Sequence, residues 1–66
     1  MKITTIKQYE RRNSNDNQLY ALIPVGTVLD IDEILPDYYL VTADRPITKD
    51  NDDSIYVSKK ELDSMQ

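Results

Sequence analysis

Carboxylates are the first candidates for chemistry in this sequence, because the 66 residues include no histidine and no cysteine. This composition excludes thiolate nucleophiles, imidazole acid-base catalysis and zinc sites built on those residues. Asp30, Asp32 and Glu33 could be read as the paired acids of a hydrolase. However, Asp30 and Asp32 alternate with the apolar Leu29 and Ile31, which places the carboxylates on the solvent face of a strand and the apolar pair in the core. We therefore predict that the protein is not an enzyme.

A second group of acids and hydroxyls lies between residues 50 and 61. Its spacing is similar to that of a calcium-binding EF-hand loop, and the matching oxygen ligands are Asp50, Asp52, Ser54, Ser58 and Glu61. Ile55 occupies the position where such a loop needs a glycine, and Pro46 lies where the entering helix would run. We therefore expect a loop, a strand and a capped helical turn in this region, with no metal and no cofactor.

Charge and hydropathy limit the partners and the location. The chain has 12 acidic and 8 basic residues, and a net charge of −4 repels phosphate backbones and anionic lipids. Neither nucleic acid nor a membrane is an expected partner. The longest apolar stretch, residues 19 to 25, is shorter than the roughly 20 residues of a membrane span, and the first residues lack the apolar region of a signal peptide. The expected location is the cytoplasm, with the acidity serving solubility.

The elements predicted for this chain are short β-strands in one domain, residues 1–66. Apolar residues fall in short runs rich in β-branched and aromatic types, without a helical period, and polar segments separate these runs. The expected strands are Ile3–Tyr9, Tyr20–Ile23, Thr27–Leu35, Tyr38–Ala43 and Ile55–Val57.

Local signals predict how the strands are connected. Gly26 is the only glycine and is expected to adopt a positive φ in the turn before the third strand. The sequence at residues 35–37 favours a tight turn because it contains a proline followed by an aspartate. Ser58 and Glu61 have the spacing of a capping box, which predicts a short helix with Leu62 as its buried contact.

The aromatic residues are five tyrosines, with no phenylalanine or tryptophan. Some of them must therefore build the core, and we expect Tyr39 or Tyr20 inside together with Val41. Tyr9 and Tyr38 are expected to be partly exposed, where a large ring with a polar tip suits an interface.

The order of these features resembles a Src-homology-3 domain over nearly the entire chain. The segment from Gln18 to Ile31, with Pro24 and Gly26, resembles the part of that family that leaves the first long loop and enters the central sheet. The pair Tyr38-Tyr39 resembles the aromatic pair that opens the next strand. The resemblance implies an all-β fold, a five-stranded Src-homology-3-like barrel with a short C-terminal helical turn, of the diverged type found in bacterial and phage proteins.

The resemblance keeps only part of that family's ligand groove. Tyr9 and Tyr38 match two of its aromatic positions, whereas Lys7, Val57 and Lys60 stand where the family has tyrosine and proline. Proline-rich peptides dock between aromatic rings, so losing half of the rings removes most of the contact surface. Proline-rich peptides are therefore not the expected ligands.

We expect a non-enzymatic protein-binding module, such as a phage or mobile-element accessory protein that modulates a host protein. Two alternatives remain open: an acidic inhibitor whose carboxylates imitate DNA phosphates, and a structural subunit that self-associates, as small domains often do. The basic pair Arg11-Arg12 is expected to open a solvated loop that runs to Gln18. The predicted contact residues are Tyr9, Arg11, Arg12, Asp30, Asp32, Asp37 and Tyr38.

Overall fold

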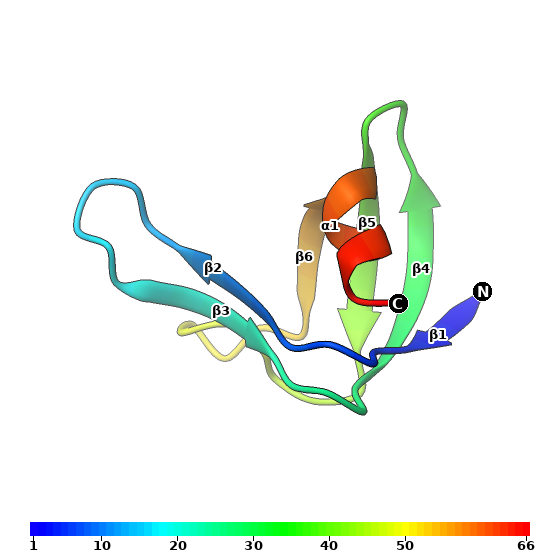
Figure 1. Cartoon of the computed structure of the whole chain (residues 1–66), viewed down its shortest axis with the longest axis horizontal. Coiled ribbons are helices and arrows are strands. Elements are labelled where there is room, and N and C mark those ends of the chain that lie inside the picture. Colours follow the sequence, from blue (N-terminus) through cyan, green and yellow to red (C-terminus); the bar gives the residue numbers. More distant parts are fainter.

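The structure is a computed structural model that describes residues 1–66, and it consists of six short strands and one helix (Figure 1). The helix is α1 (Lys59–Ser64). Every strand pair is antiparallel, and the all-β class expected from the sequence is confirmed. The strands are β1 (Lys2–Thr4), β2 (Tyr9–Arg12), β3 (Leu19–Ile23), β4 (Val28–Ile34), β5 (Tyr38–Ala43) and β6 (Ser54–Ser58).

The strands form two sheets and do not close into a barrel. The larger sheet has the order β1-β4-β5-β6, and the smaller sheet consists of β2 and β3. The expected five-stranded barrel is therefore wrong in strand number and in closure. β2 and β6 are both edge strands, and side chains rather than a backbone ladder connect them.

The strand expected over Ile3–Tyr9 is broken at Thr5, which is buried. The Thr5 hydroxyl donates to the Pro24 carbonyl at 2.8 Å and accepts from the Thr27 amide at 3.0 Å. Gly26 has the predicted positive φ, 85°, and its amide donates to the Thr5 carbonyl at 2.8 Å. These bonds fix the chain to the turn between β3 and β4, so that β1 and β2 join different sheets.

The hairpin of β4 and β5 has the short turn predicted at residues 35–37, where the Leu35 amide donates to the Tyr38 carbonyl at 2.8 Å. A register shift between Ile31 and Glu33 marks an irregularity in β4, of the kind that increases local twist. In Figure 1 the turn of this hairpin projects beyond α1 at the top of the view.

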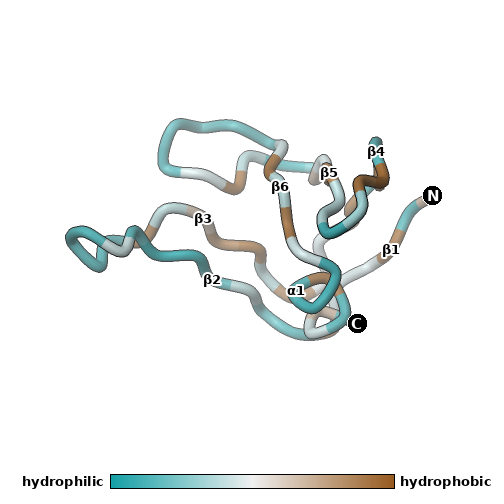
Figure 2. The backbone as a smooth tube through the Cα atoms, turned by 90° about the horizontal axis from the view of Figure 1, so that it is seen from above, coloured by the Kyte–Doolittle hydropathy of each residue, from teal (hydrophilic) through white to brown (hydrophobic).

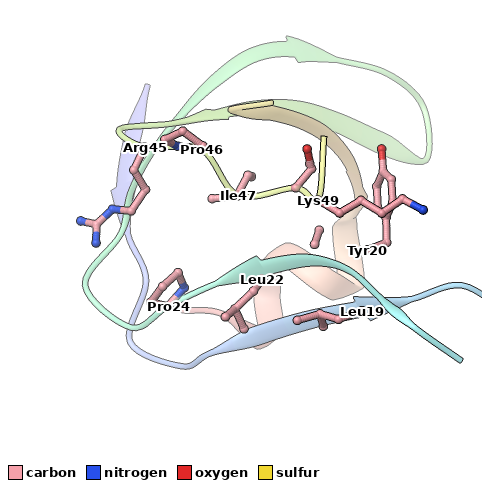
Figure 3. A pocket seen from close by; sticks show the side chains of 10 residues that line it. Leu19, Tyr20, Leu22, Pro24, Arg45, Pro46, Ile47 and Lys49 are labelled. Atoms are coloured by element: carbon pink, nitrogen blue, oxygen red, sulfur yellow. The ribbon is translucent and has the colours of Figure 1, made fainter. Parts of the chain in front are cut away.

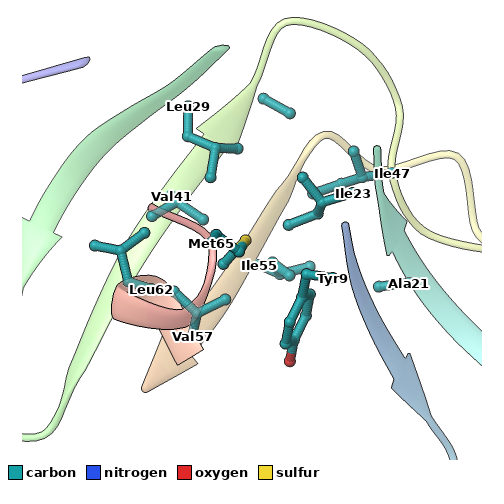
Figure 4. Close-up of a cluster of buried hydrophobic side chains, with 11 residues drawn as sticks. Tyr9, Ala21, Ile23, Leu29, Val41, Ile47, Ile55, Val57, Leu62 and Met65 are labelled. Carbon is teal, nitrogen blue, oxygen red and sulfur yellow. The ribbon is translucent and has the colours of Figure 1, made fainter. Parts of the chain in front are cut away.

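The core lies between the two sheets, and α1 completes it (Figure 4). Leu29 and Val41 are fully buried as expected, whereas Ile31 is only half-buried at the edge of the core. Figure 2 shows the loop between β2 and β3 as hydrophilic and much of β3 as hydrophobic. The buried apolar residues are Tyr9, Ala21, Ile23, Leu29, Val41, Ala43, Ile47, Ile55, Val57, Leu62 and Met65.

The capping box predicted at the start of α1 is present. The Glu61 amide donates to the Ser58 hydroxyl at 3.0 Å, and the Ser58 amide donates to Glu61 Oε1 at 2.8 Å. Leu62 is buried as expected, and Met65 at the end of the helix is buried with it. The residues with calcium-loop spacing thus form the end of a turn, the strand β6 and a helix cap.

The segment between β5 and β6, expected to be a loop, adds a short stretch to the smaller sheet. The Leu22 amide donates to the Ile47 carbonyl and the Lys49 amide donates to the Tyr20 carbonyl, both at 2.8 Å. An isolated bridge joins Thr48 to β3 between these bonds. This pairing covers the edge of β3 that β2 leaves free.

Candidate protein-binding surfaces

Tyr9 lies in the core, at 8% exposure, so its expected partial exposure is wrong. Its hydroxyl donates to Glu61 Oε2, and Arg11 Nε donates to the Tyr9 oxygen at 3.0 Å. Arg11 Nη2 also donates to the Tyr56 carbonyl at 2.7 Å and lies 3.4 Å from Glu61 Oε1. This network joins β2 to β6 and α1 across the open side of the two sheets.

Two groups in this network have shifted pKa values. Burial raises the pKa of Tyr9 above its ordinary 10.0, and the hydrogen bond to Glu61 raises it further. Burial alone would also raise the pKa of Glu61, but hydrogen bonds from the Ser58 backbone and from Tyr9, together with the Arg11 charge, lower it below 4.5. The folded state therefore favours a neutral phenol beside an ionised carboxylate.

Arg11 and Arg12 belong to strand β2, so the expected solvated loop begins after them. The Arg11 guanidinium is occupied by the network with Tyr9 and Glu61. Arg12 is exposed, where its Nη1 donates to the Asn17 carbonyl at 3.1 Å and its Nη2 lies 3.4 Å from a Glu10 carboxylate oxygen. Of the two, Arg12 is the one that faces solvent.

The outer face of the larger sheet, which points away from the core, carries two exposed tyrosines. Tyr38 is 50% exposed, as expected for a contact residue, and Tyr56 is 51% exposed. Leu40 is half-buried and directly opposite Tyr56, while Tyr38 is the diagonal neighbour of Tyr56 across β5 and β6. We call these three residues the tyrosine patch.

Leu40 and Tyr56 are the members of this patch that were missed by sequence reasoning. For Tyr56 the signal was present in its alternation with Ile55 and Val57, both of which are buried in the core. Tyr39 and Tyr20 are half-buried and pack against the core, in line with the expectation that one of them helps to build it.

The opposite end of the outer face is acidic. A hollow of about 280 Å³ there is lined by Asp30, Asp32 and Asp44 together with Lys2 and Thr42. Each carboxylate has a partner of its own: the N-terminal ammonium lies 3.5 Å from Asp30, the Thr42 hydroxyl donates to Asp32, and Arg45 Nε lies 3.1 Å from Asp44. The hydrogen bond from Arg45 lowers the pKa of the Asp44 carboxyl.

An apolar groove is lined by β3 and by residues 45–49, which pair with that strand (Figure 3). Its volume is about 310 Å³. Leu22 and Pro24 line it from the β3 side, and Pro46 lines it from the facing segment. None of its lining residues is acidic, and they are Leu19, Tyr20, Ala21, Leu22, Pro24, Arg45, Pro46, Ile47, Thr48 and Lys49.

The predicted contact residues thus occupy three separate places. Tyr9 and Arg11 are inside the network between the sheets, with Arg12 exposed further along β2. Asp30 and Asp32 lie at the acidic end of the outer face. At the other end, Tyr38 belongs to the tyrosine patch and Asp37 is exposed in the adjoining turn.

Comparisons with known proteins do not indicate a function for this chain. No protein-family model matches the chain, and no curated protein or solved structure matches it. The only helix, α1, has six residues, so no helix is long and apolar enough to cross a membrane.

Proposed function

We propose that this protein is a non-enzymatic protein-binding module that contacts its partner through the tyrosine patch. The observation that carries this proposal is the position of two half-exposed tyrosines, Tyr38 and Tyr56, which are diagonal neighbours on the outer face and both adjoin Leu40. A tyrosine ring contributes a large contact area at a small entropic cost, and its hydroxyl can bond to a partner.

The hydroxyl groups of these tyrosines are free, in contrast to that of Tyr9. Tyr9 donates to Glu61 within the fold, whereas no hydrogen bond within the chain involves the hydroxyl of Tyr38 or Tyr56. Leu40 supplies a half-buried apolar floor between the two rings. A partner can therefore bury apolar area and gain two hydrogen bonds at the same place, which is the composition of an interface hot spot.

The same proposal covers the fold family and the setting. We propose a diverged Src-homology-3-like fold, supported by the long loop after β2, the glycine turn before β4 and the capped helix after β6. The setting is the cytoplasm, as an accessory protein of a phage or mobile element that modulates a host protein. The lack of catalysis is supported by a sequence without histidine or cysteine and by the use of Tyr9 and Glu61 to hold the fold together.

The experiment is affinity capture from a bacterial lysate with the wild-type chain and with a Tyr38→Ser, Tyr56→Ser double variant. Val25→Ser is the matched control, because Val25 is an exposed apolar residue outside the patch. We expect the wild type and the Val25 variant to retain the same partner and the double variant to lose at least nine-tenths of it. Capture of that partner at equal yield by the double variant, or no partner for any variant, would contradict the proposal.

An acidic inhibitor that imitates DNA is the second candidate, and the acidic hollow on the outer face favours it. Its binding would depend on Asp30 and Asp32, would weaken steeply as salt is raised, and would be insensitive to the tyrosine substitutions. Capture of a nucleic-acid-binding protein at low salt only, with Asp30→Asn and Asp32→Asn abolishing it, would favour this candidate over the tyrosine patch.

A further inference from the structure

We propose that copies of this chain associate head to tail, with the β4–β5 turn of one copy seated in the apolar groove of the next. The turn segment consists of residues 33–37, and the groove is lined by β3 and residues 45–49. Self-association of this kind does not depend on the tyrosine patch.

The turn segment presents apolar side chains to solvent. Ile34 is 70% exposed and Leu35 is 37% exposed, although both are large aliphatic residues. The end of β4 is one of the most hydrophobic parts of the backbone in Figure 2. Glu33 and Asp37 stand on either side of these residues, and neither carboxylate has an ion-pair partner within the chain. The turn is therefore an apolar tip between two unpaired negative charges.

The groove has the complementary composition. Its floor is apolar, and Figure 3 shows Arg45 toward one end and Lys49 toward the other. Lys49 has no ion-pair partner, and Arg45 is paired only with the neighbouring Asp44 at the surface. An exposed pair of this kind contributes little free energy and can be exchanged. In a chain with a net charge of −4, a concave apolar surface with two cations and no acid selects for an acidic, apolar ligand.

The two surfaces can meet only between copies. In Figure 1 the β4–β5 turn is at the top, whereas β3 and the segment between β5 and β6 lie toward the bottom of the view. The turn of a chain therefore cannot enter its own groove. A contact between two different surfaces leaves one free turn and one free groove on each pair, so that further copies can add to form an open chain or a larger ring.

The contact is small, and association should be correspondingly weak. A groove of about 310 Å³ accepts only a few side chains, so the area that the contact buries should be well below the roughly 1,200 Å² of a stable interface. The charges at its ends are exposed, so added salt should weaken their contribution. We therefore expect association that appears at high protein concentration and decreases with salt.

Sedimentation equilibrium of the purified chain tests the association itself. At low salt and protein concentrations up to the millimolar range, the weight-average mass should rise continuously past twice the monomer mass, and high salt should reduce it. A mass that stays at the monomer value throughout would overturn the proposal. A mass that stops at twice the monomer value would also overturn it, since that result indicates a closed dimer.

Two variants test the surfaces. The tip variant Ile34→Ser, Leu35→Ser and the groove variant Arg45→Glu, Lys49→Glu change exposed positions, and Ile6→Ser is the control at another exposed apolar residue. Each variant alone should remain monomeric, while the control should associate like the wild type. Equal association by the wild type and either variant would contradict the proposed contact.

Mixing the two variants gives the sharpest test. The tip variant keeps its groove and the groove variant keeps its tip, so an equimolar mixture should form a one-to-one dimer and no larger species. Circular dichroism of each variant checks whether the strands are retained. A mixture of folded variants that stays monomeric would overturn the head-to-tail arrangement. Because all variants keep Tyr38 and Tyr56, these results leave the test of the proposed function independent.

Discussion

Glu61 is the residue that does most to connect the parts of this molecule. Its carboxylate completes the capping box with Ser58, and it also accepts the Tyr9 hydroxyl and lies beside Arg11. The charge of this one side chain therefore connects three elements, because Glu61 lies on α1 and its partners lie on β2 and β6.

Acid should weaken the fold through Glu61. Its pKa is lower in the folded chain than its ordinary value of 4.5, so the stability that this group contributes is present above pH 4.5 and is lost as the pH falls through the folded pKa. In urea unfolding measured between pH 7 and pH 3, Glu61→Gln should show a shallower loss of stability than the wild type. It should also be less stable than the wild type at neutral pH. An identical pH dependence for both proteins would contradict this role.

Sequence reasoning at the level of single residues succeeded where the partners are close in the chain. The capping box and the positive φ of Gly26 were predicted because each depends on a few neighbouring residues. The burial of Tyr9 was not predicted, because its partner Glu61 is 52 residues away along the chain. The sequence contains both residues but does not indicate that they meet.

The largest difference between the expected and the observed strands is the break that divides the expected first strand into β1 and β2. Alternation in the sequence is compatible with one strand over Ile3–Tyr9, but the Thr5 hydroxyl satisfies backbone groups of Pro24 and Thr27 instead. β5 was predicted with its bounds, since its apolar residues are flanked by polar turns. A side chain that bonds to a distant turn gives no periodic signal, which is why the break was missed.

Replacing Gly26 tests the turn that separates β3 from β4. A Cβ at this position would meet no atom within 4 Å, so the cost of Gly26→Ala comes only from the positive φ of 85°. We expect a loss of about 1 kcal/mol in the free energy of unfolding. Gly26→Asn should cost less, because asparagine tolerates left-handed conformations. Chemical denaturation of both variants measures the difference, and equal stability of Gly26→Ala and wild type would refute the strain.

At the scale of the whole molecule, the open arrangement of the two sheets decides which surfaces are available. The network of Tyr9, Arg11 and Glu61 fills the side where a closing strand would pair, so the free edge of β6 is blocked by side chains. The outer face of the larger sheet is open to solvent, with the tyrosine patch, where we propose that a partner binds, at one end and the acidic hollow at the other.

Sequence reasoning predicted which of these side chains are exposed better than it predicted which of them share one face. Tyr38, Asp32 and Asp37 are exposed, as expected. Assigning Tyr9 to the same surface failed, because the relative position of two sheets depends on contacts distant in sequence. The apolar groove had no sequence signal, since its two walls come from β3 and from a segment that pairs with it after a long connection.

The most direct measurement is NMR mapping of the isotope-labelled chain as the captured partner is added. The backbone amides of Tyr38, Leu40 and Tyr56 should shift or broaden at substoichiometric partner, while those of the groove segment 45–49 stay unchanged. Perturbations confined to Asp30, the neighbouring carboxylates or the groove, with the tyrosine patch unaffected, would contradict the central claim that this patch is the protein-binding surface.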